Sequence, residues 1–298
     1  MGYSARYHTA SLAAVFLALA VGILIGAEFG DDVISGTAES LEESLSEDLD
    51  EANATIEDLE RELDREERFA EAVYPALADD ALIGRDIAVV AFGTRPDDLR
   101  DNVLEALEPT GAEITQVAVF REPPDFDALA ELGRSVNVPR SRREREEIAA
   151  LRAGQALVTG GEFYQQAQET LLSAFSGEVS GVDGVIVARP APPQPADEEQ
   201  EEDERDAMAI EEFETNVLSG LTSSGVPVIG VERSDADPPS IEFLASRGLT
   251  TVDDIDLVAG RVAMVYALRG AQGTFGIGED ANELLPPLLG RQGAPDVG

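Results

Sequence analysis

Three carboxylates lie close together near the C-terminal end of the chain, at Asp253, Asp254 and Asp256. Carboxylate oxygens are the ligands that hard cations such as Ca²⁺ prefer, so these residues are candidates for a cation site. Acidic residues also gather just before a helix, where they cap its first turn, and a helix is expected to begin near Leu257. Both interpretations of the cluster remain open from the sequence.

Histidine, cysteine and methionine, which carry most nucleophilic and soft-metal chemistry, are scarce. The chain has no cysteine and a single histidine, His8, which precedes the first apolar segment. No Ser-His-Asp triad can therefore form in the C-terminal part of the chain, and disulfide bonds and thiolate metal sites are excluded. After Met1, the only methionines are Met208 and Met264. We predict that the protein is not an enzyme and carries no cofactor.

Three segments contain glycines where ligand-binding loops occur. Gly93-Thr94-Arg95 follows a predicted strand but lacks the glycines of a dinucleotide fingerprint. Gly160-Gly161 precedes a predicted helix, where N–H groups can bind an anion, and serves equally well as a tight turn. Gly270–Gly278 follows a helix rather than a strand, which is the wrong context for a phosphate-binding loop. We interpret the first two segments as connections and expect no phosphate at the third.

The charge of the chain excludes one class of partner. Sixty acidic residues stand against 21 basic ones, all arginine, for a net charge of −39. Such a surface repels nucleic acid, so we predict no nucleic-acid partner. A hydrophobic fraction of 43% is at the same time typical of a folded chain.

Residues 10–27 are apolar apart from Ser11 and carry no charge. A helix of this length reaches the lower limit for crossing a bilayer, so we predict a transmembrane signal anchor. Arg6 precedes the segment and Glu28 follows it, which places residues 1–9 in the cytoplasm and the bulk of the chain outside. The residues expected to contact lipid are Ser11, Leu12, Val15, Phe16, Leu17, Leu19, Val21, Ile23, Leu24 and Ile25.

Two other interpretations of this segment remain. A cleaved signal peptide would end at a small residue, and Ala27 could serve, although Ile25 two positions earlier fits poorly. A helix buried in the protein core is the third possibility. The predicted anchor implies that the lipid bilayer is a partner of the protein and that the protein resides in the cell membrane as a single-pass protein.

A charged helical segment follows, over residues 32–75. Apolar residues recur in two heptad series offset by three positions, which is the seam of a coiled coil. We predict a stalk that associates with other copies of the chain. A helix that packs back on the globular part is the alternative. The predicted seam residues are Leu45, Leu49, Ile56, Leu59 and Leu63.

The remaining sequence, residues 82–285, alternates strand and helix patterns, which predicts an α/β domain of three layers with a mostly parallel sheet. Tyr74-Pro75 is expected to end the preceding helix. Residues 190–206 are rich in proline and then acidic, which predicts a mobile loop, and residues 286–298 are expected to be disordered. The predicted strands are 86–93, 113–120, 156–159, 184–188 and 226–231, and the predicted helices are 96–107, 126–132, 141–153, 162–175, 207–222, 240–246 and 257–269.

Two long segments resemble one known family. Arg6–Gly26 (RYHTASLAAVFLALAVGILIG) and Gly248–Pro286, which contains TTVDDIDLVAG, are similar to the two ends of the MctB family of actinobacterial copper-transport proteins. Phe275 stands where that family often has tyrosine. The resemblance implies an envelope protein of copper transport or homeostasis, and a location in an outer membrane.

Copper binds to cysteine, methionine or histidine, and the α/β domain offers only Met208 and Met264. We therefore expect the protein to act without coordinating copper directly, either by assembly with its own copies or with envelope protein partners, or by weak attraction of cations to its acidic surface. The alternative function is a non-transporting envelope scaffold or a ligand-binding module with a Rossmann-like domain. A degenerate enzyme domain with a retained cleft would show a pocket at the carboxyl ends of the strands.

Overall fold

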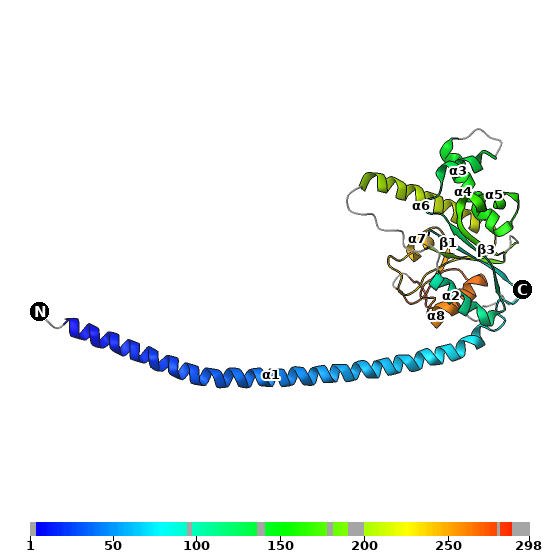
Figure 1. Cartoon of the computed structure of the whole chain (residues 1–298). Helices are drawn as coiled ribbons and strands as arrows, with labels where there is room; N and C mark the ends of the chain where they lie inside the picture. Colours follow the sequence, from blue (N-terminus) through cyan, green and yellow to red (C-terminus); the bar gives the residue numbers. More distant parts are fainter. Residues whose placement is uncertain are drawn as a thin grey trace, which may run out of the picture. The chain divides into compact units, whose positions relative to one another are not determined.

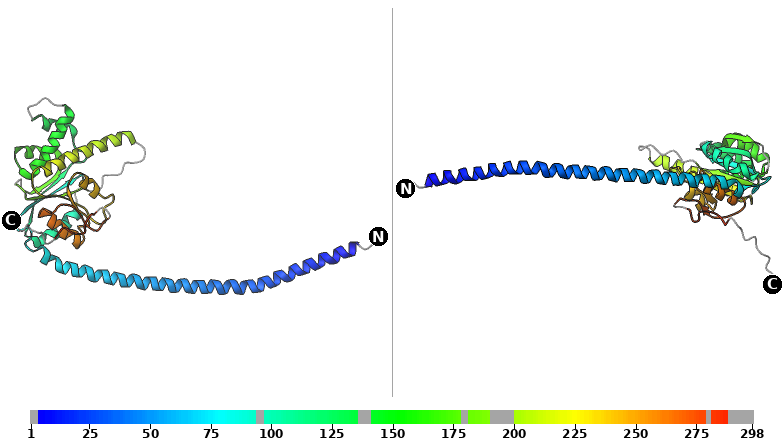
Figure 2. Two further views of the ribbon diagram at one scale, coloured as in Figure 1. Left: turned by 180° about the vertical axis from the view of Figure 1, so that it is seen from behind. Right: turned by 90° about the horizontal axis from the view of Figure 1, so that it is seen from below.

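The computed structural model (Figures 1 and 2) describes the backbone of residues 4–93, 97–135, 141–177, 181–189, 200–278 and 281–287. Within these ranges, the side chains of residues 4–10, 26–43, 135 and 200–204 lie outside the description. The chain divides into two parts, Met1–Arg68 and Phe69–Gly298, and each is described by itself.

The first part consists of helix α1 (Ser4–Ala78), which continues into the second part. The large apolar side chains of residues 11–25 are exposed, with fractions between 48% and 69%. Among the residues that the structure describes, no helix is long and apolar enough to cross a membrane. The transmembrane helix expected at 10–27 is therefore not found, and the ends of that segment, residues 10, 26 and 27, lie outside the described side chains.

The predicted stalk is helical throughout residues 32–75, as part of α1. Its five seam residues, Leu45, Leu49, Ile56, Leu59 and Leu63, are all exposed in the single chain. The prediction that Tyr74-Pro75 ends the helix is wrong, because α1 includes Pro75 and reaches Ala78. Tyr74 and Ala78 are buried in the core of the second part, and this packing offsets the local cost of proline.

The second part is a seven-stranded sheet in the order β3-β2-β1-β4-β5-β6-β7. Neighbouring strands are parallel except for the antiparallel pair β2 and β3. The strands are β1 (Asp86–Phe92), β2 (Glu113–Phe120), β3 (Leu172–Gly177), β4 (Gly184–Ala188), β5 (Val228–Val231), β6 (Thr250–Val252) and β7 (Thr274–Phe275). The predicted mixed α/β fold with a mostly parallel sheet is confirmed.

Helices cover both faces of this sheet (Figures 1 and 2). One face packs against α3 (Phe126–Leu132), α4 (Arg142–Thr159), α5 (Glu162–Leu171), α6 (Gln200–Thr222) and α7 (Ile241–Ser246). The other face packs against the end of α1, α2 (Asp97–Leu107) and α8 (Val258–Leu268). Because successive residues of a strand point to opposite faces, β1 sends Val90 to the first core and Val89 to the second.

The end of α1 is fixed to the domain by polar contacts. Arg261 on α8 is buried, and its Nη1 lies 3.1 Å from Glu71 Oε1 and 3.0 Å from Glu105 Oε1. Arg261 Nη2 also donates to the Asp256 carbonyl at 3.0 Å. The Tyr74 hydroxyl donates to the Ala106 carbonyl, and burial raises the pKa of Tyr74. The last turns of α1 therefore belong to the core of the second part.

Several predicted elements differ from the structure. Residues 156–159 are the last turn of α4 rather than a strand, because the helix continues without a break to the glycine pair. The helix expected over 162–175 ends at Leu171, and the antiparallel strand β3 follows directly. The short strands β6 and β7 are absent from the sequence prediction.

The acidic segment and the tail are described only in part. Residues 190–199 of the predicted loop lie outside the described residues, whereas residues 200–206 form the first turns of α6. Consecutive acidic residues are favourable at the N-terminal end of a helix, which explains the difference. In the tail, residues 288–298 lie outside the description.

Candidate functional site at the carboxyl edge of the sheet

The carboxyl ends of the parallel strands gather charged residues at one edge of the sheet. Glu122 comes shortly after β2, Arg189 after β4, Glu232 after β5 and Asp253 after β6. The chain order reverses between β1 and β4, because β2 lies on one side of β1 and β4 on the other. Open α/β sheets bind ligands at such a switch point, so this edge is the candidate site.

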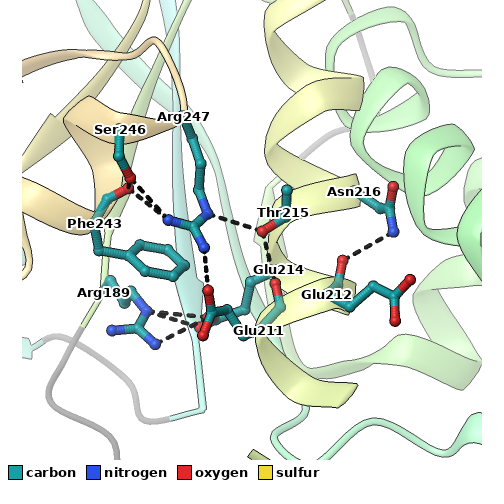
Figure 3. A network of polar contacts seen from close by, with 9 residues as sticks. All are labelled: Arg189, Glu211, Glu212, Glu214, Thr215, Asn216, Phe243, Ser246 and Arg247. Carbon is teal, nitrogen blue, oxygen red and sulfur yellow. Dashed lines mark hydrogen bonds and ion pairs between the residues drawn. The ribbon is translucent and has the colours of Figure 1, made fainter. Parts of the chain in front are cut away.

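Arg189 and Glu214 form the centre of the edge (Figure 3). Arg189 Nε lies 3.0 Å from Glu214 Oε1, and Nη2 lies 3.0 Å from Oε2. The pair is therefore bidentate, which fixes both side chains in orientation. Glu214 is only 1% exposed. Burial raises the pKa of its carboxyl group, and the hydrogen bonds and charge of Arg189 oppose that rise.

Two arginines contact the ring of Phe243 on α7. The Cζ atom of Arg189 lies 3.9 Å from the ring centre and that of Arg247 lies 3.4 Å from it, and Figure 3 shows the ring between the two guanidinium groups. Arg247 also donates to Thr215 Oγ1 at 2.8 Å and pairs with Glu211 Oε1 at 2.5 Å, both on α6. These contacts connect α6, α7 and the end of β4.

Glu122 lies next to the switch point. Its carboxylate approaches Gly93, where an added Cβ would lie 2.5 Å from Glu122 Oε2. Gly93 has a φ of 68°, which favours glycine. Burial raises the pKa of Glu122, and Arg189 lowers it. The charge of Arg189 therefore lowers the pKa of two carboxylates, those of Glu122 and Glu214, and its hydrogen bonds go to Glu214.

A second carboxylate centre lies at the end of β6. The Ile277 N–H donates to Asp253 Oδ1 at 2.9 Å and to Asp254 Oδ2 at 3.1 Å, and the Gly278 N–H donates to Asp253 Oδ2 at 3.0 Å. A Cβ at Gly276 would overlap the Asp253 carboxylate. Burial, a hydrogen bond with Asp254 and the charge of Asp254 raise the pKa of Asp253 to about 7.

The structure does not bring all three candidate cation ligands together. Asp253 and Asp254 face the glycine segment, whereas Asp256 accepts hydrogen bonds from the Ser234 N–H at 2.8 Å and hydroxyl at 2.6 Å. Burial by itself would raise the pKa of the Asp256 carboxyl group, but the hydrogen bonds from Ser234 hold that pKa below its usual range. Within the described part of the chain, no group of three or more His, Cys, Asp or Glu residues is placed to hold a metal ion.

The other glycine segments have structural roles. Gly160 and Gly161 both have positive φ, and they separate α4 from α5. Gly276-Ile277-Gly278 does present N–H groups to an anion, but the anion is the carboxylate of Asp253 in the same chain.

The soft-metal candidates lie in different surroundings. Met264 on α8 is fully buried in the core, and Met208 on α6 is 67% exposed. They lie on opposite faces of the sheet, because α8 and α6 cover different faces. The side chain of His8 lies outside the described residues. The two methionines therefore cannot form one copper site within the chain.

Sequence reasoning located the acidic cluster at residues 253–256 but missed Arg189, Glu214 and Glu122. One signal was present, because Arg189 directly follows a predicted strand at the edge where ligands bind. Its partner Glu214 is separated from it by the segment 190–199, so no local pattern links the two residues.

Known proteins resemble this chain along most of its length. Residues 3–286 match the family described as "Copper transport outer membrane protein, MctB". The "Copper transporter MctB" of Mycobacterium tuberculosis is 25% identical over 312 residues, which cover 93% of this chain and 97% of the relative. The protein of the same name from Mycobacterium bovis gives the same values. Because the family match spans nearly the whole sequence, the chain belongs to the MctB family of copper transport proteins.

Proposed function

We propose that the protein is anchored in a membrane, forms oligomers and serves copper transport or homeostasis without coordinating copper in its α/β domain. Membership of the family indicates a copper-transport-related envelope protein. The placement of the two methionines supports the absence of copper coordination in the α/β domain, since Met264 is buried and Met208 is exposed on the opposite face. In this proposal the protein serves copper by assembly with its copies or with envelope proteins, and it catalyses no reaction.

The membrane anchor is residues 10–27, with residues 1–9 in the cytoplasm and the bulk of the chain outside. The apolar residues Leu12, Phe16 and Ile23 are exposed on α1, and so are their apolar neighbours. Exposed apolar surface on this scale is unfavourable in water, and lipid would cover it. Mass spectrometry of the protein from washed membranes tests the anchor. An intact N-terminus in the membrane fraction supports it, and a mature protein that begins near Glu28 overturns it.

The oligomer forms through residues 32–75. The seam residues Leu49, Ile56 and Leu63 are exposed at heptad spacing on a continuous helix, and pairing with further copies buries them. Light scattering of the detergent-solubilised chain measures the oligomeric state. Leu49→Asp with Ile56→Asp is expected to give monomers.

The matched control for this pair is Ser44→Asp with Ala54→Asp. These two changes add the same charges to the same helix, away from the seam. Loss of the oligomer in both variants would mean that added charge, rather than the seam, disrupts association. An unchanged oligomer in both would reject the stalk.

Copper tolerance tests the role itself. A strain without the gene is expected to become sensitive to copper, and the full chain should restore tolerance while the seam variant should not. Met208→Leu with Met264→Leu is expected to restore tolerance fully, because the methionines bind no copper in this proposal. Loss of tolerance in that variant, with normal folding by circular dichroism, would show that the methionines contribute ligands.

The second candidate is a non-transporting envelope scaffold or ligand-binding module. The charged carboxyl edge at the switch point favours it, since Arg189 and Glu122 lie where related sheets bind ligands. Wild-type copper tolerance of the deletion strain, together with sensitivity to osmotic or cell-wall stress, would support this candidate and defeat the first.

A further inference from the structure

The proposed stalk carries an excess of negative charge beside its apolar seam. Residues 44–68 contain eleven acidic and three basic residues, which gives a net charge of −8. They form one continuous stretch of α1, and every side chain in this range is exposed in the single chain. Association along the seam therefore brings strongly acidic helices together.

The heptad pattern determines which side chains border the seam. Leu49, Ile56 and Leu63 take the a positions, and the e and g positions lie on either side of the seam. Glu66 takes a d position within the seam itself. Opposite charges at e and g usually attract the partner helix. Within residues 44–68, the charged residues at e and g are all acidic, namely Asp48, Glu60, Glu62 and Glu67.

The arginines of the stalk lie on the outer surface of the helix. Arg61, Arg65 and Arg68 take the c and f positions, away from the seam. Arg61 pairs with Asp58 at 2.7 Å, and Arg68 pairs with Asp64, both within the same helix. Such pairs, three or four residues apart, support the single helix. Because the arginines face away from the seam, they offer a second copy no basic side chain at its border.

A second copy meets this border with like charges. Copies that are anchored at residues 10–27 leave the membrane from the same side, so their stalks run parallel. A g residue of one helix then lies beside the e residue of the next heptad in the other helix, which places Glu62 of one copy next to Glu67 of the other. These charges repel, whereas burial of the apolar seam attracts. Dissolved salt screens the repulsion.

We propose that ionic strength switches the stalk, which is dissociated at low salt and associated at high salt. The repulsion between charges extends over about 30 Å at a salt concentration of about 0.01 M, and over about 3 Å at about 1 M. At high salt it therefore no longer outweighs burial of the seam. This inference rests on the proposed function, since it describes how the proposed stalk oligomer is regulated.

Sedimentation velocity of the full chain in an uncharged detergent tests the switch. The oligomeric state is measured in sodium chloride from about 0.01 M to about 1 M. We expect separate chains at low salt, an oligomer at high salt, and a dissociation constant that falls by at least about tenfold across the range. Equal association at both ends overturns the switch and retains the stalk. Separate chains at every salt concentration reject the stalk, and the switch with it.

A single charge reversal tests the contact between Glu62 and Glu67. Glu62→Arg places opposite charges across this contact, so the variant should remain an oligomer at low salt. Glu51→Arg is the matched control, because it changes the charge of the chain equally at a c position, away from the seam. The control should dissociate at low salt, as wild type should. Low-salt dissociation of Glu62→Arg, or low-salt association of both variants, overturns the proposal.

The seam variant separates the stalk from contacts elsewhere in the chain. Leu49→Asp with Ile56→Asp should give separate chains at high salt as well as at low salt. An oligomer of this variant that forms only at high salt overturns the proposal, because salt would then act on another surface. Near-UV circular dichroism of wild type should be the same at both salt concentrations. A change at low salt would also overturn the proposal, because unfolding of the α/β domain would then accompany dissociation.

Discussion

The carboxyl edge of the sheet holds two buried carboxylates in opposite ways. Glu214 is neutralised by the bidentate guanidinium of Arg189. Asp253 accepts hydrogen bonds from the backbone N–H groups of Ile277 and Gly278 and lies beside a second carboxylate, Asp254. The first arrangement depends on one side-chain partner, and the second depends on backbone shape and on a proton. The comparison teaches that burial alone does not define how a carboxylate responds to mutation or to pH.

The largest effect is expected at Arg189. Arg189→Met leaves Glu214 buried without its partner, which should lower the free energy of unfolding by about 3–5 kcal/mol. Urea unfolding of the full chain, followed by circular dichroism, measures this loss. The double variant Arg189→Met, Glu214→Gln should recover most of it, because no unpaired charge remains. A double variant as unstable as the single one would show that Arg189 acts through packing instead.

The second prediction concerns the backbone around Asp253. Gly276→Ala should lower the free energy of unfolding by about 2–3 kcal/mol, because the new methyl group overlaps the Asp253 carboxylate at a φ of 142°. Gly270→Ala is the control, since Gly270 also has a positive φ, of 103°, but an added Cβ meets nothing within 4 Å. Equal losses in the two variants would assign the effect to backbone strain and remove the role of the carboxylate contact.

Phe243 is expected to contribute less. Phe243→Leu keeps an apolar side chain but removes the ring that Arg189 and Arg247 contact, so the loss should be about 1–2 kcal/mol. Thermal unfolding of the full chain measures it. Phe163→Leu is the control, because its ring meets one arginine at a longer distance, 5.8 Å from Arg152 Cζ. A loss at Phe163 as large as that at Phe243 would contradict the stacking argument.

The smallest effect at pH 4, and the one that depends most on pH, is expected from Asp253→Asn. The pKa of Asp253 is raised from 3.8 to about 7 in the folded chain, so the folded state binds the proton more tightly than the unfolded state. Its contribution to stability is therefore full below pH 4 and is lost as the pH rises toward 7 and above. Unfolding measured from pH 4 to 8 should show a decline in wild type that Asp253→Asn lacks. Identical pH profiles for wild type and Asp253→Asn would contradict the raised pKa of Asp253.

The sequence predicts best those strands and helices whose burial is visible in their own residue pattern. The strands Asp86–Phe92 and Gly184–Ala188 are continuous apolar runs because both faces of a parallel strand are covered. Strand β3 was missed because Leu172–Gly177 is an edge strand in which serine, alanine and glycine accompany Leu172 and Phe175, and because it follows α5 without a break. Its strand state comes from pairing with β2, which no local pattern contains.

The candidate site was predictable only where its residues are neighbours in sequence. Asp253 and Asp254 were found as a cluster, but their partner segment begins at Gly276 and reaches them through the β6–β7 pair. The sequence also shows that Gly270–Gly278 is rich in glycine, but it does not show that the N–H groups of this segment bind the carboxylate of Asp253. The membrane anchor and the stalk association stay predictions, since they concern lipid and further copies of the chain.

The contacts of Arg261 determine where this protein can be shortened. A fragment that begins at residue 82, the start of the α/β sequence pattern, lacks Glu71 and Tyr74 and leaves the buried guanidinium of Arg261 with one carboxylate instead of two. A fragment that begins just before Phe69 keeps both residues. Expression trials of the α/β domain should therefore start upstream of Phe69, within the segment that the sequence predicts to be the stalk.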